Sequence, residues 1–243
     1  MTVLAIRGRP PTVETDRAVG DQLLERAADG RRVVRVWRPH RQVAFGRRET
    51  RLEGYERARE IARQRGFPPV ERDVGGRAVA YAGSTVAFVR AEPAPGRPGE
   101  SNVPRTGIEE RYERASADLQ RALSSLGVDA RRGEPGDSFC PGAHSLRARG
   151  KIVGIAQRVR TDAAITGGIV LVRDHAAVAA VLEPVYDALG TALDPTTVGS
   201  IARAGGDADP DRVVRAVESG LAGDADVRAV DVETVAGAPS GAG

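Results

Sequence analysis

Hydrophobic residues recur along this chain with two different spacings, and segments of the two kinds are interleaved. Segments with apolar residues three and four positions apart predict amphipathic helices, several of which end at a glycine. These helices are expected over residues 15–30, 54–65, 106–127, 174–182, a segment after Pro184, and 209–221. Short alternating or continuous apolar runs predict strands over residues 3–6, 32–37, 43–46, two strands within 70–81, and 84–89, 128–130, 152–159, 163–172 and 227–235.

The order of these elements predicts the architecture. Strands and helices follow one another without strict alternation, which favours a mixed β-sheet flanked by helices, an α/β (α+β) fold. A chain of 243 residues can bury a full core, so we expect one domain over residues 1–235, with a mostly helical C-terminal part at 173–222. The proline- and glycine-rich stretch 91–104 predicts an exposed loop, and the small residues 236–243 predict a disordered tail.

Composition narrows the possible functions. The net charge is only +3, although Lys and Arg number 36, because 33 acidic residues are interspersed with them. Nucleic-acid binders more often concentrate basic and aromatic residues, and aromatic residues make up just 4% of this chain. No apolar run approaches the roughly 20 residues that span a bilayer, and the N-terminus lacks the features of a secretory signal peptide. We therefore expect a cytoplasmic protein without membrane or nucleic-acid partners, whose mildly basic surface suits an acidic protein.

The single cysteine, Cys140, and the single lysine, Lys151, lie close together in the sequence. One cysteine excludes an intrachain disulfide and cysteine-based metal centres, and three scattered histidines do not replace them, so no metal site is predicted. Cys140 precedes a Pro-Gly pair, which predicts a loop, and Lys151 follows Gly150 at the start of a predicted strand.

This Cys–Lys pair is typical of acyl-transfer chemistry. A thiolate is a nucleophile, an ammonium nearby favours the thiolate, and a partly desolvated lysine accepts and returns protons as arginine cannot. The alternative is that Cys140 is a small buried apolar residue and Lys151 has no special role. His144 is a second candidate base for the thiol, although a histidine on a loop is more often solvated.

Glycines provide a weaker signal. Gly75 and Gly76 separate two predicted strands, where they either allow the backbone to approach a ligand closely or form a tight hairpin turn. Gly154, inside a predicted strand, indicates a close approach of backbone or ligand.

Three segments together resemble a known family. SFCPGAHSLRARGKIVGIAQR, residues 138–158, resembles the active-site segment of the lipoate/octanoate protein transferases, within the biotin and lipoate protein ligase superfamily. It is most similar to the octanoyl-[GcvH]:protein N-octanoyltransferase branch. RDVGGRAVAY, residues 72–81, resembles the family's Arg-Arg-x-x-Gly-Gly-Gly-Ala-Val-x-His segment, and VAFGRRE, residues 43–49, resembles an earlier strand. The resemblance covers residues 37–171.

The resemblance implies a biotin/lipoate protein ligase-like catalytic domain that transfers an octanoyl or lipoyl group to a lysine of a lipoyl carrier domain. The implied carriers are the glycine cleavage H protein and the E2 subunits of 2-oxoacid dehydrogenases. Cys140 would carry the acyl group as a thioester, Lys151 would help to activate it, and no cofactor would be required. The implied substrate-binding residues are Arg72, Gly75, Gly76, Arg77, Ala78, Gly154 and Gln157.

The sequence departs from the family pattern at three positions. Glu71 stands where the first arginine is usual, Arg77 replaces the third glycine, and Tyr81 falls near the usual histidine. Arg77 either fills space or reaches a carboxylate, and both remain open. The main alternative function is an ATP-dependent lipoate–protein ligase, which would use ATP and Mg²⁺ and bind an adenylate through Lys151, but such an enzyme needs no thiol at position 140. A non-catalytic binding module is a third hypothesis.

Overall fold

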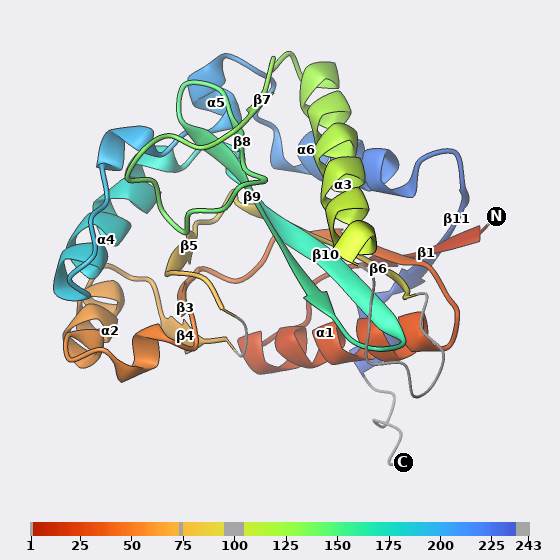
Figure 1. Cartoon of the computed structure of the whole chain (residues 1–243), viewed down its shortest axis with the longest axis horizontal. Coiled ribbons are helices and arrows are strands. Elements are labelled where there is room, and N and C mark those ends of the chain that lie inside the picture. The colour runs from red at the N-terminus through yellow and green to blue at the C-terminus, as the bar shows by residue number, and fades with distance from the viewer. Residues whose placement is uncertain (1, 73–74, 95–104, 237–243) are drawn as a thin grey trace.

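A large mixed sheet forms the centre of the protein (Figure 1). The computed structural model describes residues 2–72, 75–94 and 105–236. The strand order is β11-β1-β2-β6-β10-β9-β8-β7; β1 pairs in parallel with β2 and β11, and the other neighbours are antiparallel. The strands are β1 (Thr2–Arg7), β2 (Val33–Trp37), β6 (Val86–Pro93), β7 (Arg131–Arg132), β8 (Leu146–Arg147), β9 (Lys151–Val159), β10 (Ala163–Val170) and β11 (Asp226–Asp231).

A second sheet has three short strands in the order β4-β3-β5, with β3 in the middle. These strands are β3 (Gln42–Phe45), β4 (Pro69–Glu71) and β5 (Val79–Tyr81). The helices are α1 (Val13–Ala28), α2 (Tyr55–Gln64), α3 (Arg105–Ser125), α4 (His175–Ala188), α5 (Ile201–Ala204), α6 (Pro210–Ala222) and α7 (Val232–Ala236), with short 3₁₀ helices η1 (Glu49–Arg51) and η2 (Pro195–Thr197). Among the helices of the described segments, none combines the length and the apolar character that a bilayer crossing requires.

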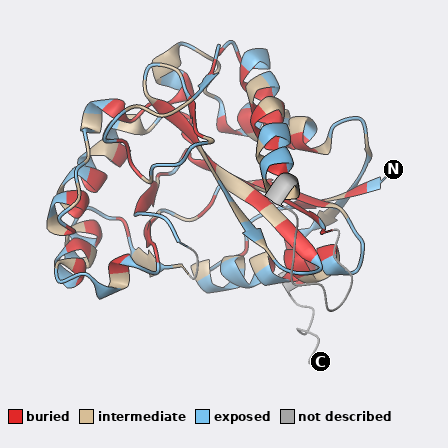
Figure 2. Ribbon diagram, viewed as in Figure 1, coloured by how far each residue is buried: buried red, intermediate tan, exposed pale blue. Residues whose placement is uncertain are grey.

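Three apolar clusters hold these elements together. One lies between the large sheet and the pair α3 and α6, and another lies between the sheet and α1 with α7. The third joins the small sheet to α2 and α4, which lie together at one end of the molecule in Figure 1. Buried residues accordingly follow the strands and the inward sides of the helices (Figure 2). The predicted mixed sheet flanked by helices is confirmed.

Several predicted boundaries are wrong. Helix α1 begins at Val13 instead of residue 15, because Thr12 is its cap and forms a reciprocal capping box with Thr15. The predicted strand 128–130 is replaced by β7, two residues long. In the predicted loop 91–104, β6 continues to Pro93, and residues 95–104 lie outside the described segments, as do residues 237–243 of the predicted tail.

Strand β2 is buried on both faces instead of one. Arginine alternates with apolar residues in this strand, which is typical of a strand with one face in solvent, but Arg35 is only 1% exposed. Its guanidinium donates a 2.5 Å hydrogen bond to Asp16 of α1 and stacks over the Trp37 ring at 4.0 Å. A buried charge requires such a partner, and the partner lies on a helix that a period-two pattern does not identify.

A single helix, α4, replaces the two helices predicted on either side of Pro184. Proline usually breaks a helix because it lacks the N–H that would bond to the carbonyl four residues earlier, here Ala180. Arg65, which follows α2, donates a 2.8 Å hydrogen bond to that carbonyl. A side chain from another helix thus satisfies the oxygen that Pro184 leaves free, and α4 continues to Ala188.

The predicted strand 227–235 is also divided, into β11 and α7. Asp231 accounts for the change, because its carboxylate accepts a 2.8 Å hydrogen bond from the backbone N–H of Glu233 and its carbonyl accepts one from the Thr234 hydroxyl. These local bonds start a helical turn where the alternating apolar pattern predicts more strand.

Candidate active site

Cys140 lies on the loop between β7 and β8, and the backbone there is held in an unusual conformation. Its φ angle is +41°, in the left-handed region that a non-glycine residue seldom adopts. The Cys140 N–H donates a 2.7 Å hydrogen bond to the Tyr186 hydroxyl, and the Cys140 carbonyl accepts a 2.7 Å bond from Lys151 Nζ. The side chain is half-buried, so the loop presents the sulfur at the surface in a fixed direction.

Lys151, the first residue of β9, holds this loop through hydrogen bonds from its buried ammonium group. It is 1% exposed, and its three ammonium hydrogens are matched by the carbonyls of Phe139 and Cys140, at 2.9 and 2.7 Å, and by Glu134 Oε1 at 3.1 Å. Burial lowers the pKa of Lys151, and the Glu134 carboxylate opposes that shift. The predicted proximity of Cys140 and Lys151 is therefore seen, but the ammonium donates to the cysteine carbonyl, and no hydrogen bond joins Lys151 Nζ to the sulfur.

The start of β9 is fixed by a close backbone contact. Gly150 has a φ of +111°, and a Cβ there would lie 2.8 Å from Gly199 N and from the Thr197 carbonyl. The Gly199 N–H donates a 2.9 Å hydrogen bond to the Lys151 carbonyl. Glycine before Lys151 thus allows the chain to pass against the segment after η2, which directs the lysine into the interior.

Glu134 organises the cysteine loop. One carboxylate oxygen accepts hydrogen bonds from the Ser138 hydroxyl at 2.7 Å and from Lys151 at 3.1 Å. The other oxygen accepts from the Gly142 N–H at 2.5 Å and the Ser145 hydroxyl at 3.0 Å. Four donors on both sides of Cys140 therefore converge on one carboxylate, which closes the loop around the ammonium.

The Gly-Gly segment lies directly against the sulfur. A Cβ on Gly76, whose φ is +94°, would lie 3.0 Å from Cys140 Sγ and 2.9 Å from Arg72 Nη2. Arg72 Nη2 itself lies 3.8 Å from Sγ and donates a 2.6 Å hydrogen bond to the Arg77 carbonyl. Cationic groups beside a cysteine favour the thiolate, and Arg72 is the cation that contacts the sulfur among the described residues.

Two further residues join the Gly-Gly segment to the rest of the site. Glu49 is buried, and its two oxygens accept backbone N–H groups of Gly46 and Ala78, at 2.7 and 2.8 Å. Burial raises the pKa of Glu49, while these two hydrogen bonds oppose the shift. The Tyr186 hydroxyl, which accepts from Cys140, donates to the Ala78 carbonyl at 2.9 Å, so one phenol bridges the two segments.

The structure brings most of the predicted site residues together around the sulfur. Arg72, Gly76 and Ala78 contact it or its supports, as described above, and Gly75 and Arg77 flank Gly76 at the surface. The Gly-Gly pair does not form a hairpin between β4 and β5, because both strands pair with β3 instead. The predicted close approach of backbone is seen, and it occurs at Gly76.

Gly154 and Gln157 are farther along β9. A Cβ on Gly168 of β10 would lie 1.9 Å from the Gly154 carbonyl, so the close approach at this point is between two backbones. Gln157 is six residues from Lys151, roughly 20 Å along an extended strand. Its amide accepts from Arg111 Nε at 3.0 Å and donates to the Ile108 carbonyl at 2.8 Å, which joins β9 to α3. Substrate-binding roles for both residues stay predictions.

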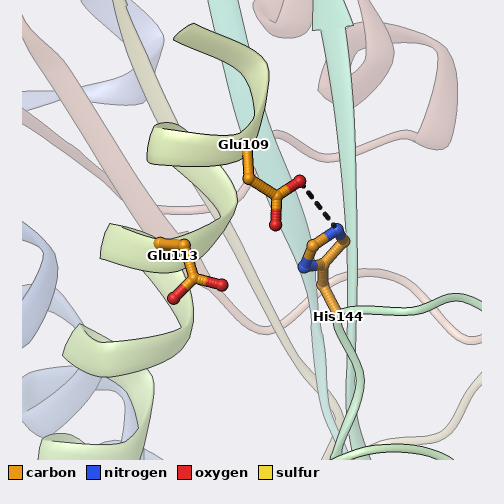
Figure 3. A group of neighbouring side chains, drawn as sticks. All are labelled: Glu109, Glu113 and His144. Carbon is orange, nitrogen blue, oxygen red and sulfur yellow. Dashed lines mark ion pairs between the residues drawn. The ribbon is translucent and has the colours of Figure 1, made fainter. Parts of the chain in front are cut away.

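His144 faces helix α3 (Figure 3). Its ring stacks on Tyr112 with centroids 3.9 Å apart, and its Nε2 lies 3.9 Å from a Glu109 oxygen. The ligand atoms of Glu109, Glu113 and His144 lie within 4.8 Å of one another, a spacing that a cation can bridge, but Glu113 already forms an ion pair with Arg132. These contacts make His144 a link between the loop and α3, and its role as a base for the thiol stays a prediction.

Sequence reasoning missed Glu49, Glu134 and Tyr186. Glu134 could have been found, since it stands in the same glycine- and proline-rich loop as Cys140 and a buried lysine needs a carboxylate nearby. Tyr186 carries no local signal, because it lies 46 residues from Cys140, in the last turn of an apolar helix.

Comparisons with known proteins agree with this geometry. The model of the lipoyl protein ligase A/B catalytic domain matches residues 13–222. Among curated proteins, the octanoyl-[GcvH]:protein N-octanoyltransferase of Geobacillus kaustophilus is 32% identical over 127 residues, 52% of this chain and 42% of the relative. The protein of the same name from Kyrpidia tusciae is 29% identical over 168 residues, 68% and 55% of the two chains. The chain thus spans about half the length of the curated relatives it matches.

Solved structures show the same fold. A lipoate-protein ligase A bound with ATP superposes with a TM-score of 0.71 at 19% identity, covering 97% of this chain and 92% of the other. A bi-partite lipoate protein ligase from Thermoplasma acidophilum, described with its E2 lipoyl domain, gives a TM-score of 0.69 at 20% identity, covering 97% and 90%. The resemblance that the sequence motifs predict is confirmed for the family. Because the family model extends over most of the residues that build the sheets and the thiol site, the chain belongs to the lipoyl protein ligase A/B catalytic domain family.

Proposed function

We propose that this protein is an acyltransferase that carries an octanoyl or lipoyl group as a thioester on Cys140 and passes it to a lysine of a lipoyl carrier domain. The observation that carries the proposal is the half-buried Cys140 sulfur, held beside Arg72 and Gly76 by a loop that Lys151 and Glu134 fix. The names of the relatives support octanoyl-[GcvH] as donor and a second protein as acceptor.

The proposed reaction has two halves. The Cys140 thiolate attacks the acyl carbonyl of the donor, the bond from that carbonyl to the donor breaks, and the leaving group takes up the proton that the thiol lost. The amine of the acceptor lysine then attacks the thioester, the C–S bond breaks, and a proton from the amine restores the thiol. Arg72 stabilises the thiolate in both halves. Lys151 contributes positive charge through the carbonyl it binds and keeps the strained loop in place.

Cofactor use separates this proposal from its main alternative. The transferase needs no cofactor, whereas a lipoate–protein ligase would consume ATP with Mg²⁺ and bind an adenylate through Lys151. The three hydrogen bonds of Lys151 to Glu134 and to the cysteine loop favour a structural and electrostatic role over a free ammonium that awaits a phosphate. The glycine cleavage H protein, E2 lipoyl domains and a cytoplasmic location belong to the same proposal.

The test is an acyl-transfer assay with and without ATP. Wild-type protein incubated with an octanoylated carrier should gain one octanoyl group on Cys140, detected by mass spectrometry and released by hydroxylamine, without ATP. Cys140→Ala should lose both the adduct and the transfer to a second carrier. Retention of full transfer by Cys140→Ser, together with pyrophosphate exchange with ATP, would establish the ligase instead.

A further inference from the structure

Three arginines lie next in sequence to two glycines that contact each other beside the thiol. Gly46, at the end of β3, touches the Gly-Gly segment so closely that a Cβ there would lie 1.9 Å from the Gly76 carbonyl. Gly76 in turn touches the Cys140 sulfur. Arg47 and Arg48 directly follow Gly46, Arg77 directly follows Gly76, and all three side chains are exposed. We call Arg47, Arg48 and Arg77 the arginine rim.

Among the described residues, the arginine rim is neutralised only in part. No ion pair or side-chain hydrogen bond joins any of the three guanidinium groups to a described residue. Glu49, the acid that follows Arg48, is buried, and its two oxygens accept hydrogen bonds from backbone N–H groups. Arg77 attracts this carboxylate without forming an ion pair with it. The exposed Glu71 accepts a 2.9 Å hydrogen bond from the Tyr55 hydroxyl. Elsewhere on the surface, many arginines form ion pairs, as Arg59 does with Glu56 and Arg132 with Glu113.

The other side of the entrance to the thiol site carries no such charge. Between Glu134 and His144 the exposed residues are Gly136, Asp137, Pro141, Gly142 and Ala143, of which Asp137 alone is charged, and its charge is negative. A carrier that delivers a side chain to Cys140 must rest its body on the surface around the entrance. It therefore meets the cysteine loop, with the acidic Asp137, on one side and the arginine rim on the other.

We propose that the arginine rim is the docking surface for the carrier, and that it selects a protein domain with carboxylates around its acylated lysine. This inference rests on the proposed function. Opposite charges at the edge of an interface speed encounter, fix orientation and suppress wrong partners. Guanidinium groups pair with carboxylates in a defined, often bidentate geometry. The arginine rim thus sets the orientation of the bound carrier while the acylated lysine side chain of the carrier reaches the sulfur between Arg72 and Gly76.

A protein partner fits the rim better than a nucleic acid. The net charge of the chain is only +3, and aromatic residues that would stack with bases are scarce. The rim is local, confined to residues next to two glycines that contact each other at the site. A small phosphate ligand such as ATP remains a distinct outcome of the experiment.

The experiment reverses the charge of Arg47 and Arg48 together and leaves Arg77 unchanged because of its predicted substrate contact. The matched control is Arg31→Glu with Arg228→Glu, which changes net charge equally. Both control side chains are exposed, and Arg228 lies on β11, at the opposite end of the molecule from β3 and β5 (Figure 1). Kinetics with octanoylated carrier are measured at low and at raised salt. Acylation of Cys140 by a small octanoyl thioester, which needs no carrier, is measured in parallel.

The R47E/R48E variant should raise KM for the carrier about tenfold or more and lose most of its salt dependence, with kcat at saturation changed less than about twofold. The R31E/R228E control should behave as the wild type. A carrier whose carboxylates near the modified lysine are changed to lysine should restore binding to the variant. Affinity measured by calorimetry in a Cys140→Ala background gives the same comparison without any catalytic step.

Equal carrier affinity in the rim variant and the control would overturn the docking proposal, as would a change confined to ATP or nucleic-acid binding. These results are separate from a failure of the proposed function. If the small thioester does not acylate Cys140 in the wild-type protein, the transferase itself is wrong, whatever the carrier affinities are.

Discussion

At the scale of single residues, Gly76 determines how much space remains over the sulfur. Its positive φ excludes most side chains, and a Cβ would press against both Cys140 Sγ and Arg72 Nη2. An L-residue in the left-handed region costs about 1–2 kcal/mol, and relief of that strain moves the segment off the sulfur. We expect Gly76→Ala to slow acylation of Cys140 by about 100-fold, since a displacement of roughly 1 Å at a reacting group can cost that much. Quenched-flow mass spectrometry of the thioester measures the rate.

The control for this substitution is Gly136→Ala in the cysteine loop. Gly136 is exposed, has no positive φ, and no atom lies within 4 Å of the position its Cβ would take. Its acylation rate should stay within about twofold of wild type, as for most surface substitutions. Equal rates for the two variants would contradict the role assigned to Gly76.

The sequence predicted Cys140, Lys151, Arg72 and the glycine pair as one group, and the structure brings them together. It could not predict which atom the ammonium binds. That choice depends on the left-handed turn at Cys140, which directs the carbonyl rather than the sulfur toward Lys151. Contacts of this kind depend on loop geometry, and residue types alone do not encode it.

At the scale of elements, the cysteine loop depends on a buried ion pair between Glu134 and Lys151, whose side chains are 14% and 1% exposed. Removing one partner leaves the other charge buried, so Glu134→Gln should lower the free energy of unfolding by about 3 kcal/mol. Removing both, with Glu134→Gln and Lys151→Met, should recover much of that loss, because an apolar replacement of the whole pair is close to neutral. Urea denaturation of the single and double variants gives the coupling free energy.

The exposed pair Glu56–Arg59 on α2 provides the comparison. Glu56→Gln should change stability by less than about 0.5 kcal/mol, since surface ion pairs contribute little. If the effects of Glu134→Gln and Lys151→Met simply add, the two side chains are not coupled and another contact closes the loop.

The element boundaries include some that a local cap sets and one that a distant side chain sets. Asp209 caps α6 at the start of the helix predicted over 209–221, by accepting a 2.8 Å hydrogen bond from the N–H of Arg212. Helix α4 continues past Pro184 because Arg65 donates a hydrogen bond to the Ala180 carbonyl, which the proline leaves without its usual N–H partner. Arg65 and Ala180 are 115 residues apart in the sequence. A single sequence contains no signal for that compensation.

At the scale of the whole molecule, periodicity predicted the fold class but not the pairing of strands. Spacing identifies which residues face a core, while the partner of each strand depends on how all elements pack. β3 therefore takes β4 and β5 as neighbours, and β1 pairs in parallel with β11 from the opposite end of the chain. The parallel pairing of β1 with β11 brings both ends of the described chain to one edge of the sheet, far from the thiol site.

That edge is completed by α7, whose Val232 and Val235 are 2% and 0% exposed in the cluster that also contains α1. Each Val→Ala substitution there removes two buried methyl groups, so each should lower the free energy of unfolding by about 2 kcal/mol. Val227→Ala on the neighbouring β11, where the side chain is 45% exposed, should cost less than about 0.5 kcal/mol. Urea denaturation of the three variants compares them directly. Equal stability of all three variants would mean that α7 is not part of the folded core. A loss of unfolding free energy confined to the Val232 and Val235 variants, with Cys140 acylation unchanged, would show that this edge stabilises the domain without shaping its active site.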